Sequence, residues 1–322
     1  MKSLATHCFC MIILTFAGAS EGPAQTGYPA RPIRFIVPQA TGGSNDTLSR
    51  LMAHHLSERL GKQVVVDNRA GADGIIGTEI AARAAPDGHT WLMASGAYAM
   101  NAAVRKTPFD PSTAFTWISK LGAGPSVLAV HPSLPVTSLK ELLALGKARP
   151  GYLNMASAGG FQHFVSVLFR SMTHLEMTII LYKGGFPALL DVMSGQAHLI
   201  LGSYVTSQTH VRSGKLRALA SGSAKRSALL PDLPTIAEAG VPGYDASNYW
   251  AVASPAGTPP AIVNRLNGDI AAILKLPEIQ KRFNAEGAET DHQPPTAIDA
   301  YMQSQIAKWT RVAREVGMVS EK

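Results

Sequence analysis

Cysteine is nearly absent from this sequence. The 322 residues contain 2 cysteines, Cys8 and Cys10, and both lie in a segment that we expect export to remove. The mature chain would therefore carry no thiol and no disulfide. This excludes cysteine catalysis, cysteine-ligated zinc and a disulfide-stapled scaffold.

Charged and aromatic residues are scarce as well, at 16% and 7% of the chain. The formal net charge is +7, yet the basic residues are scattered and form no run of the kind that nucleic-acid binders carry. Few aromatic rings are available to stack on bases, so we expect no nucleic-acid partner. The basic surface has two explanations, attraction of small anions and simple solubility, and the composition favours neither.

The sequence has one short apolar run at its N-terminus and no long apolar run after it. Lys2 precedes the apolar stretch 9–17, and small residues follow, with candidate cleavage sites at Ala19 and Ala24. This order predicts a signal peptide over residues 1–24, too short to span a bilayer. The alternative is a buried N-terminal strand. Cys10 lacks the residues that normally precede a lipid-modified cysteine, so we expect a chain exported without an anchor, to the periplasm of a Gram-negative cell or by secretion.

Signals for a metal or a cofactor are also missing. The 10 histidines form no pair spaced for zinc, so no metal site is expected. The stretch 71–77 has glycines in a G-x-x-G-x-x-G pattern, which differs from the dinucleotide-binding G-x-G-x-x-G, and no acidic residue ends the next strand. The sequence therefore predicts no bound cofactor.

What is present is an alternation of apolar strands and amphipathic helices. A chain of 322 residues, 46% of them hydrophobic, suggests about two domains. Strand–helix–strand order predicts parallel strands with right-handed crossovers. The expected strands are 33–37, 63–66, 90–94, 126–130, 152–156, 178–181, 199–201, 216–220 and 249–253. The expected helices are one ending before Gly61, then 74–85, one from Ser138, 162–172, 187–193, 260–274, 278–286 and 296–316.

Two α/β units emerge, and the chain crosses between them near residues 125 and 250. We assign 25–124 with 253–322 to one domain and 125–252 to the other. Ligand-binding loops of such units lie at the carboxyl ends of the strands. The loops expected to face a common cleft are 38–46, 95–98, 157–163, 182–185 and 202–204.

The loop 42–46 is the most informative of these. Adjacent glycines join a strand to the start of a helix, where free N–H groups and the helix dipole favour an anion. Ser44, Asn45 and Asp46 are candidate N-caps, so an ordinary capped turn is the competing interpretation. After a later strand, Ser157 and the following glycines offer similar donors, and His163 follows. Lys183 could hold an anion or stand as a solvated charge at the rim.

Strings along the whole mature chain resemble one protein family. They include Val37-Pro38 with Gly42-Gly43, the stretch 66–71, Tyr182-Lys183-Gly184, the stretch 214–220, and 233–240 followed by 254–259. The chain is similar to the Bug family of extracytoplasmic solute-binding proteins, the substrate-binding components of tripartite tricarboxylate transporters. The resemblance implies an α/β, two-domain, type II periplasmic-binding-protein-like fold with a ligand cleft between the domains. It also implies a small carboxylate ligand, membrane permease partners, a monomer and no catalysis.

By resemblance, two facing loops would grip the carboxylate, residues 39–46 and 157–163. The second loop is shorter here than is usual in the family, with Phe161 near the place of a hydroxyl residue. An acid that relatives often carry after the strand at 199–201 is replaced by Gly202-Ser203, and their Val-Asp before it by Ala197-His198. Expected ligand-binding residues are Gln39, Ala40, Thr41, Gly43, Ser44, Asn45, Asp46, Ser95, Ser157, Gly159, Gly160, Phe161, Gln162, His163 and Ser203.

Two other functions compete with that of a transport receptor. An exported hydrolase acting on a carboxylic ester could use Ser44 or Ser157, and a ligand-sensing domain could pass its signal to a membrane partner. Under the receptor interpretation, we expect a plain mono- or dicarboxylate, including aromatic ones. A required ammonium group would need a facing acid, because an unpaired buried charge is costly. Asp46 is the residue that could supply one, if it points into the cleft instead of capping its helix.

Overall fold

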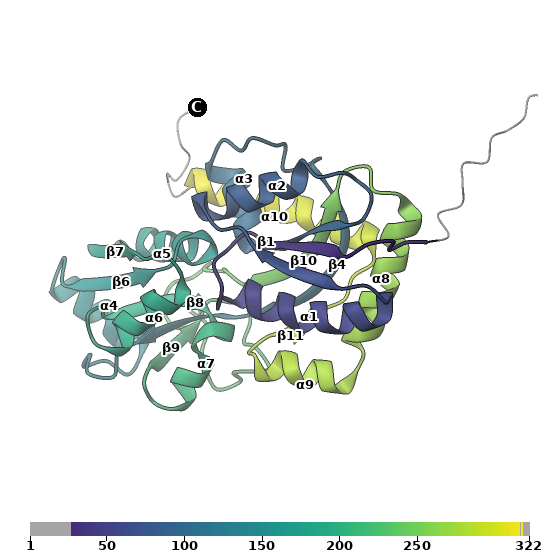
Figure 1. Ribbon diagram of the computed structural model, residues 1–322. Coiled ribbons are helices and arrows are strands. Elements are labelled where there is room, and N and C mark those ends of the chain that lie inside the picture. The colour runs from purple at the N-terminus through teal and green to yellow at the C-terminus, as the bar shows by residue number, and fades with distance from the viewer. Residues whose placement is uncertain (1–26, 316, 318–322) are drawn as a thin grey trace, which may run out of the picture.

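Two separate β-sheets organise the chain in the computed structural model, which describes residues 27–315 and 317 (Figure 1). The predicted signal peptide and both cysteines lie outside the described residues. We call the part built on the six-stranded sheet lobe 1 and the part built on the five-stranded sheet lobe 2. No helix among the described residues is long and apolar enough to cross a membrane.

The sheet of lobe 1 has the strand order β11-β4-β10-β3-β1-β2. β1 pairs in parallel with β2 and β3, which confirms the predicted parallel pairing, whereas β10 runs antiparallel between β3 and β4. Its strands are β1 (Ile33–Val37), β2 (Val64–Asn68), β3 (Thr90–Ser95), β4 (Phe115–Gly124), β10 (Asn248–Pro255) and β11 (Glu289–Thr290). Its helices are α1 (Ser44–Leu60), the short η1 (Ala72–Gly74), α2 (Ile75–Ala82), α3 (Gly96–Val104), α8 (Pro260–Leu274), α9 (Pro277–Ala285) and α10 (Pro295–Glu315).

The sheet of lobe 2 has the order β7-β6-β8-β5-β9. β6 pairs in parallel with β7 and β8, and β5 runs antiparallel to both β8 and β9. Its strands are β5 (Ser126–Val130), β6 (Leu153–Ser157), β7 (Met177–Leu181), β8 (Leu199–Ser203) and β9 (Arg217–Ser221). Its helices are α4 (Leu139–Ala148), α5 (Gly160–Thr173), α6 (Gly185–Met193) and α7 (Tyr204–Arg212).

Local sequence signals explain several helix ends. Gly61 follows α1 with φ 64°, a left-handed conformation that glycine adopts without strain. The hydroxyl of Ser138 accepts a hydrogen bond from the N–H of Glu141 at 3.2 Å. The Glu141 carboxylate in turn accepts from the N–H of Thr137 at 2.6 Å, so the predicted reciprocal cap is formed with its return bond one residue before the N-cap.

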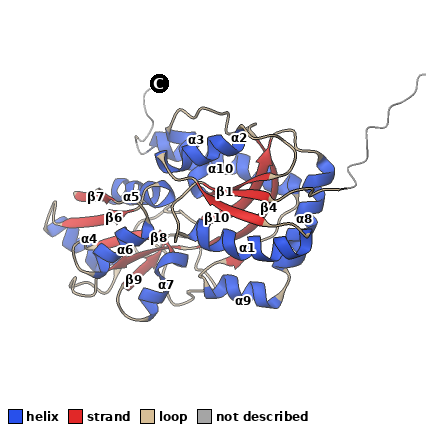
Figure 2. Ribbon diagram, viewed as in Figure 1, coloured by secondary structure: helices blue, strands red, loops and turns tan. Residues whose placement is uncertain are grey.

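Both faces of the lobe 1 sheet are covered (Figure 2). On one face, Phe35 packs with Leu48 and Met52 of α1 and with residues of α8. On the other, Ile36 packs in a cluster with Ile298 and Met302 of α10. A strand buried on both faces is mostly apolar, and every residue of β1 except Arg34, which pairs with Asp67, is apolar, so the segment 33–37 is recognisable in the sequence.

Some elements were not anticipated. α3 follows β3 without a break, α7 follows β8 in the same way, and the long β4 carries Ser119 and Lys120. Lys120 is buried, and its ammonium group pairs with the Asp291 carboxylate at 2.5 Å, which offsets the cost of burying the charge. Because a buried lysine interrupts the apolar pattern, that pattern did not predict this strand. The residue pair 252/253, where we had placed a domain boundary, lies inside β10.

Candidate ligand-binding site

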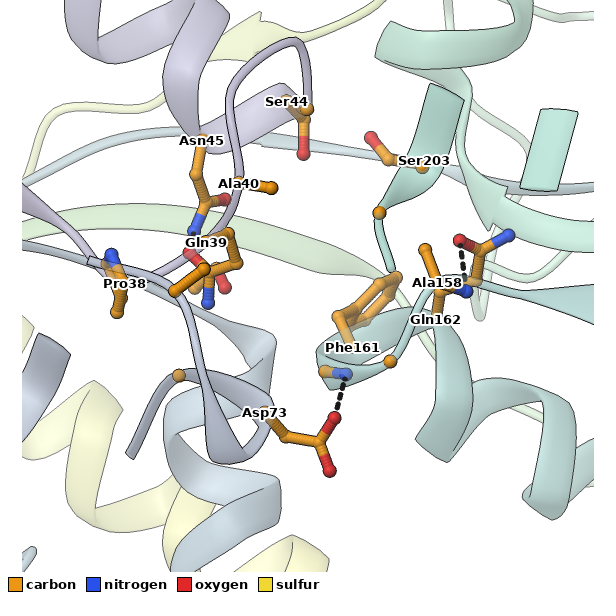
Figure 3. Close-up of a pocket in the computed structure, with 18 of the residues that line it drawn as sticks. Pro38, Gln39, Ala40, Ser44, Asn45, Asp73, Ala158, Phe161, Gln162 and Ser203 are labelled. Atoms are coloured by element: carbon orange, nitrogen blue, oxygen red, sulfur yellow. Dashed lines mark hydrogen bonds between the residues drawn. The ribbon is translucent and has the colours of Figure 1, made fainter. Parts of the chain in front are cut away.

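A cavity of about 420 Å³ lies where the two lobes face each other. Figure 3 shows Gln39, Ala40, Ser44 and Asn45 on one side, facing Phe161, Gln162 and Ser203 on the other. Each of the five segments that we expected at a common cleft contributes to the wall. The described lining residues are Pro38, Gln39, Ala40, Gly43, Ser44, Asn45, Ala70, Gly71, Asp73, Gly74, Ser95, Ala158, Gly159, Gly160, Phe161, Gln162, Tyr182, Lys183, Gly184, Gly185, Ser203, Thr206 and Asn248.

Helix N-termini surround this cavity. The first residues of α1, α5 and α6 line it, and α3 and α7 begin directly after the lining residues Ser95 and Ser203. Thr47 is the first residue of α1 to donate within the helix, to the Gly43 carbonyl at 3.0 Å, so the N–H groups before it have no helical acceptor. The dipoles of these helices add positive potential at the same place, which suits an anion.

Asn45, in the first turn of α1, holds the preceding loop in place through two side-chain hydrogen bonds. The indole N–H of buried Trp250 donates to Asn45 Oδ1 at 3.0 Å, and the Asn45 amide donates to the side-chain oxygen of Gln39. The N-cap position of α1 is occupied by Gly43, and no side chain caps the helix, so the three candidate N-caps were wrong. Instead, the Asp46 carboxylate accepts from the N–H of Gly42 at 3.0 Å.

Asp46 therefore supports the loop and is not among the described residues that line the cavity. It is 5% exposed and also pairs with Arg50 at 2.9 Å. Burial alone would raise its pKa, but the hydrogen bonds from Arg50 and the Gly42 N–H outweigh burial and lower the pKa below its usual value. The carboxylate is thus ionised and internally neutralised.

On lobe 2, the start of α5 forms the facing wall. The N–H of Ala158 donates to Gln162 Oε1 at 3.1 Å, and the N–H of Gly160 donates to Asp73 of lobe 1 at 2.8 Å. The Phe161 ring lies over the first residue of α3, since a Cβ added to Gly96 would stand 2.6 Å from its Cδ2. Phe161 gives the cavity a flat apolar surface.

Charge at the cavity comes from two residues among the described lining, Asp73 and Lys183. Lys183 is exposed at the rim, where its ammonium attracts anions. The neighbouring Tyr182 hydroxyl donates to the Asp191 carboxylate at 2.7 Å; burial and this carboxylate raise the Tyr182 pKa to about 12. Tyr182 is therefore a neutral hydrogen-bonding group at neutral pH.

Most residues that we expected at the site line the cavity. They are Gln39, Ala40, Gly43, Ser44, Asn45, Ser95, Gly159, Gly160, Phe161, Gln162 and Ser203. Four others lie outside the described lining: Thr41, Asp46, Ser157 and His163. Thr41 is exposed, and Ser157 is buried inside β6. His163 Nδ1 is buried without a partner in the described residues, and burial lowers the pKa of the ring.

Sequence reasoning missed Asp73, Asn248 and Thr206. Asp73 lies in the glycine-rich stretch after β2, which we had considered as a dinucleotide loop; its position after a parallel strand was the available signal. Asn248 begins β10 and accepts from the N–H of Gly96 at 3.0 Å. No local sequence pattern predicts that contact, because the two residues are 152 positions apart.

The cavity offers little support for a serine nucleophile. Such a serine needs a base within hydrogen-bond reach. The Ser157 hydroxyl has no hydrogen-bond partner in the described residues, and no histidine is among the described residues that line the cavity with Ser44. No group of three or more potential metal ligands occurs in the described part of the chain. The geometry is that of a binding site for a small anion.

Comparison with known proteins agrees with this geometry. Protein BugT of Bordetella pertussis is 37% identical over 311 residues, 95% of each chain. The structure of Rpa4515 from R. palustris with adipate is 37% identical, has a TM-score of 0.85, and is matched over 90% of this chain and 98% of that one. The periplasmic binding protein BugD has a TM-score of 0.86 at 31% identity, over 91% of this chain and 100% of that one.

The fold is thus the mixed α/β architecture of the periplasmic binding proteins that these solved structures represent. Residues 48–318 match the tripartite tricarboxylate transporter family receptor. That match covers most of the chain, and the relatives are similar over nearly their full lengths. The chain belongs to the family of tripartite tricarboxylate transporter receptors.

Proposed function

We propose that this protein is an exported receptor that captures a small carboxylate between its lobes and delivers it to the permease subunits of a tripartite transporter. The observation that carries the proposal is the convergence of helix N-termini on one cavity. A related protein of the same fold, Rpa4515, is described with adipate, a carboxylate. Delivery to a permease follows from the family of receptors to which the chain belongs.

The ligand lies between the loop 39–46 and the loop 157–163, with its carboxylate on the first. The N–H groups that precede Thr47 on α1 have no helical acceptor, and Gly43 has no side chain to keep a ligand away. On the second loop, Phe161 and Gln162 pack against the body of the ligand. Across the cavity, Lys183 adds a positive charge at the rim.

The receptor works as two domains that close on the ligand, with chain crossings near residues 125 and 250. β4 of lobe 1 ends at Gly124 and β5 of lobe 2 begins at Ser126, and β10 returns the chain to lobe 1. Export by the segment 1–24 would place the protein in the periplasm. We propose that it acts there as a monomer. The receptor performs no catalysis. The solute stays bound in the cavity until it is transferred to the permease.

Thermal shift measurements with a panel of small carboxylates test the proposal. Binding to the folded state alone stabilises it by about 2.7 kcal/mol when the ligand is at 100 times its Kd. Matched primary amides of the same acids serve as controls, since they keep the shape and lose the charge. We expect the melting temperature to rise with at least one acid and to stay unchanged with its amide.

A second measurement addresses the hydrolase alternative. The purified chain is incubated with carboxylic esters, and acid release is followed over time. Saturable binding of an acid without ester turnover supports the receptor. If no carboxylate raises the melting temperature while esters are hydrolysed, the receptor proposal is wrong.

A further inference from the structure

Asp73 of lobe 1 reaches across to lobe 2. It stands between β2 and α2 with φ 56°, and its Oδ1 accepts from the N–H of Gly160, the first residue of α5, at 2.8 Å (Figure 3). Its Oδ2 pairs with the guanidinium of Arg105. Asn101 holds the backbone by donating to the Asp73 carbonyl at 3.0 Å. The carboxylate is therefore held by two groups, and the backbone of the same residue by a third.

This carboxylate already occupies a donor at the start of α5. Another donor of the same loop, the N–H of Ala158, is also taken, by Gln162. The fit is tight: a Cβ on Gly159 would lie 2.7 Å from Asp73 Oδ1, so residue 159 must be glycine while Asp73 holds this position. One negative charge of the protein itself therefore already lies at the start of α5.

Arg105, the cation that balances the charge of Asp73, lies farther from the cavity than Asp73 does. Asp73 lines the cavity and its side chain is 18% exposed, whereas Arg105 is not among the described lining residues. A ligand at this end of the cavity would meet the carboxylate before the guanidinium. At short range, a like charge in a partly desolvated site is strongly unfavourable.

We propose that Asp73 determines specificity by selecting ligands with a single carboxylate. This inference rests on the proposed function, that the cavity binds a carboxylate. The one carboxylate goes to the free N–H groups of α1, and the far end of the ligand, uncharged, lies near Phe161 and Asp73. A dicarboxylate would have to place its second charge against Asp73 or displace it from Gly160.

Substitution at Asp73 provides the test, because suitable variants exist for its backbone. Glycine adopts φ 56° without strain and asparagine tolerates it, so both variants should fold. Asp73→Gly frees the Gly160 N–H and Arg105. Asp73→Asn keeps an acceptor for Gly160 and removes the charge. Asp67→Asn is the matched control, since Asp67 is an arginine-paired aspartate of lobe 1 outside the described cavity lining.

Calorimetry then compares two matched pairs of probes, hexanoate with adipate and benzoate with terephthalate. In each pair, the second acid adds one carboxylate at the far end. We expect the wild type to bind the monocarboxylate more tightly. Asp73→Gly should raise the affinity for the dicarboxylate relative to the monocarboxylate by about tenfold or more, the effect of one hydrogen bond to a charged group. Asp73→Asn should give a smaller rise, and Asp67→Asn none.

The outcomes separate the inference from the function on which it rests. A wild-type preference for the dicarboxylate, or a ratio unchanged in Asp73→Gly, overturns the role of Asp73 while carboxylate binding stands. If Asp73 merely held the lobes together, its loss would weaken both acids of a pair equally, and the ratio would not move. If no carboxylate binds either protein, the proposed function itself fails.

Discussion

Gly43→Val is the substitution that probes the anion site most sharply. Gly43 precedes α1 and lines the cavity, with φ −86° and ψ 171°. These angles are ordinary for any L residue, and an added Cβ would meet one atom, the Ala40 carbonyl oxygen, at 3.8 Å. The folded chain can therefore accept valine, whereas a ligand that must approach the backbone cannot pass it.

The size of the effect follows from the hydrogen bonds that the ligand would lose. A hydrogen bond to a charged group contributes about 1.5–3 kcal/mol, so losing two N–H donors weakens binding by roughly a hundredfold or more. Valine is a poorer N-cap than glycine, which should destabilise the fold by about 1 kcal/mol or less. In a chain of this size, that lowers the melting temperature by roughly 2 °C or less.

Calorimetry with the best acid from the thermal screen measures the affinity, and circular dichroism measures the melting temperature. Gly268→Val is the control, because Gly268 is exposed on α8 and an added Cβ meets nothing within 4 Å. The control should bind like the wild type. Wild-type affinity in Gly43→Val would refute the reasoning, since the carboxylate would then lie away from the start of α1.

Three further predictions follow from the same structure. Succinate should bind at least as tightly as aspartate, because both oxygens of Asp73 have partners and none faces an ammonium group unpaired; in calorimetry, tighter binding of aspartate would contradict this. The free energy of unfolding should fall as acid conditions take the pH below about 4, since the pKa of Asp46 is lower in the folded state and its stabilisation is lost as the pH falls through that pKa; urea unfolding of Asp46→Asn should show a smaller fall, and an equal fall would count against it. Gly77→Ala should lower the unfolding free energy by about 1–3 kcal/mol, because its Cβ would stand 2.8 Å from the Cα of Pro38; unchanged urea unfolding would show that the packing relaxes freely.

The parts of the fold that sequence patterns predicted are those governed by local interactions. The apolar run at 33–37, Gly61 after α1 and the capping box at Ser138 each depend on residues within a few positions of one another. The loops that line the cavity were also predictable, because the carboxyl ends of parallel strands meet at one edge of a sheet.

What the sequence did not reveal depends on contacts between distant residues. Asn45 is held by Trp250, 205 positions away, and Asp73 bonds to Gly160, 87 positions away. Asp46 has good N-cap chemistry, yet it ends as the buried partner of Arg50. Local patterns do not say which of several polar residues turns toward a cleft, because the facing lobe decides it.

A crystal structure of the protein with the tightest acid from the thermal screen tests the central claim most directly. The account predicts density for one ligand between the lobes, with its carboxylate accepting from N–H groups at the start of α1 and its body against Phe161. A carboxylate bound outside this cavity, or inside it without contact to the residues 43–46, would contradict the account.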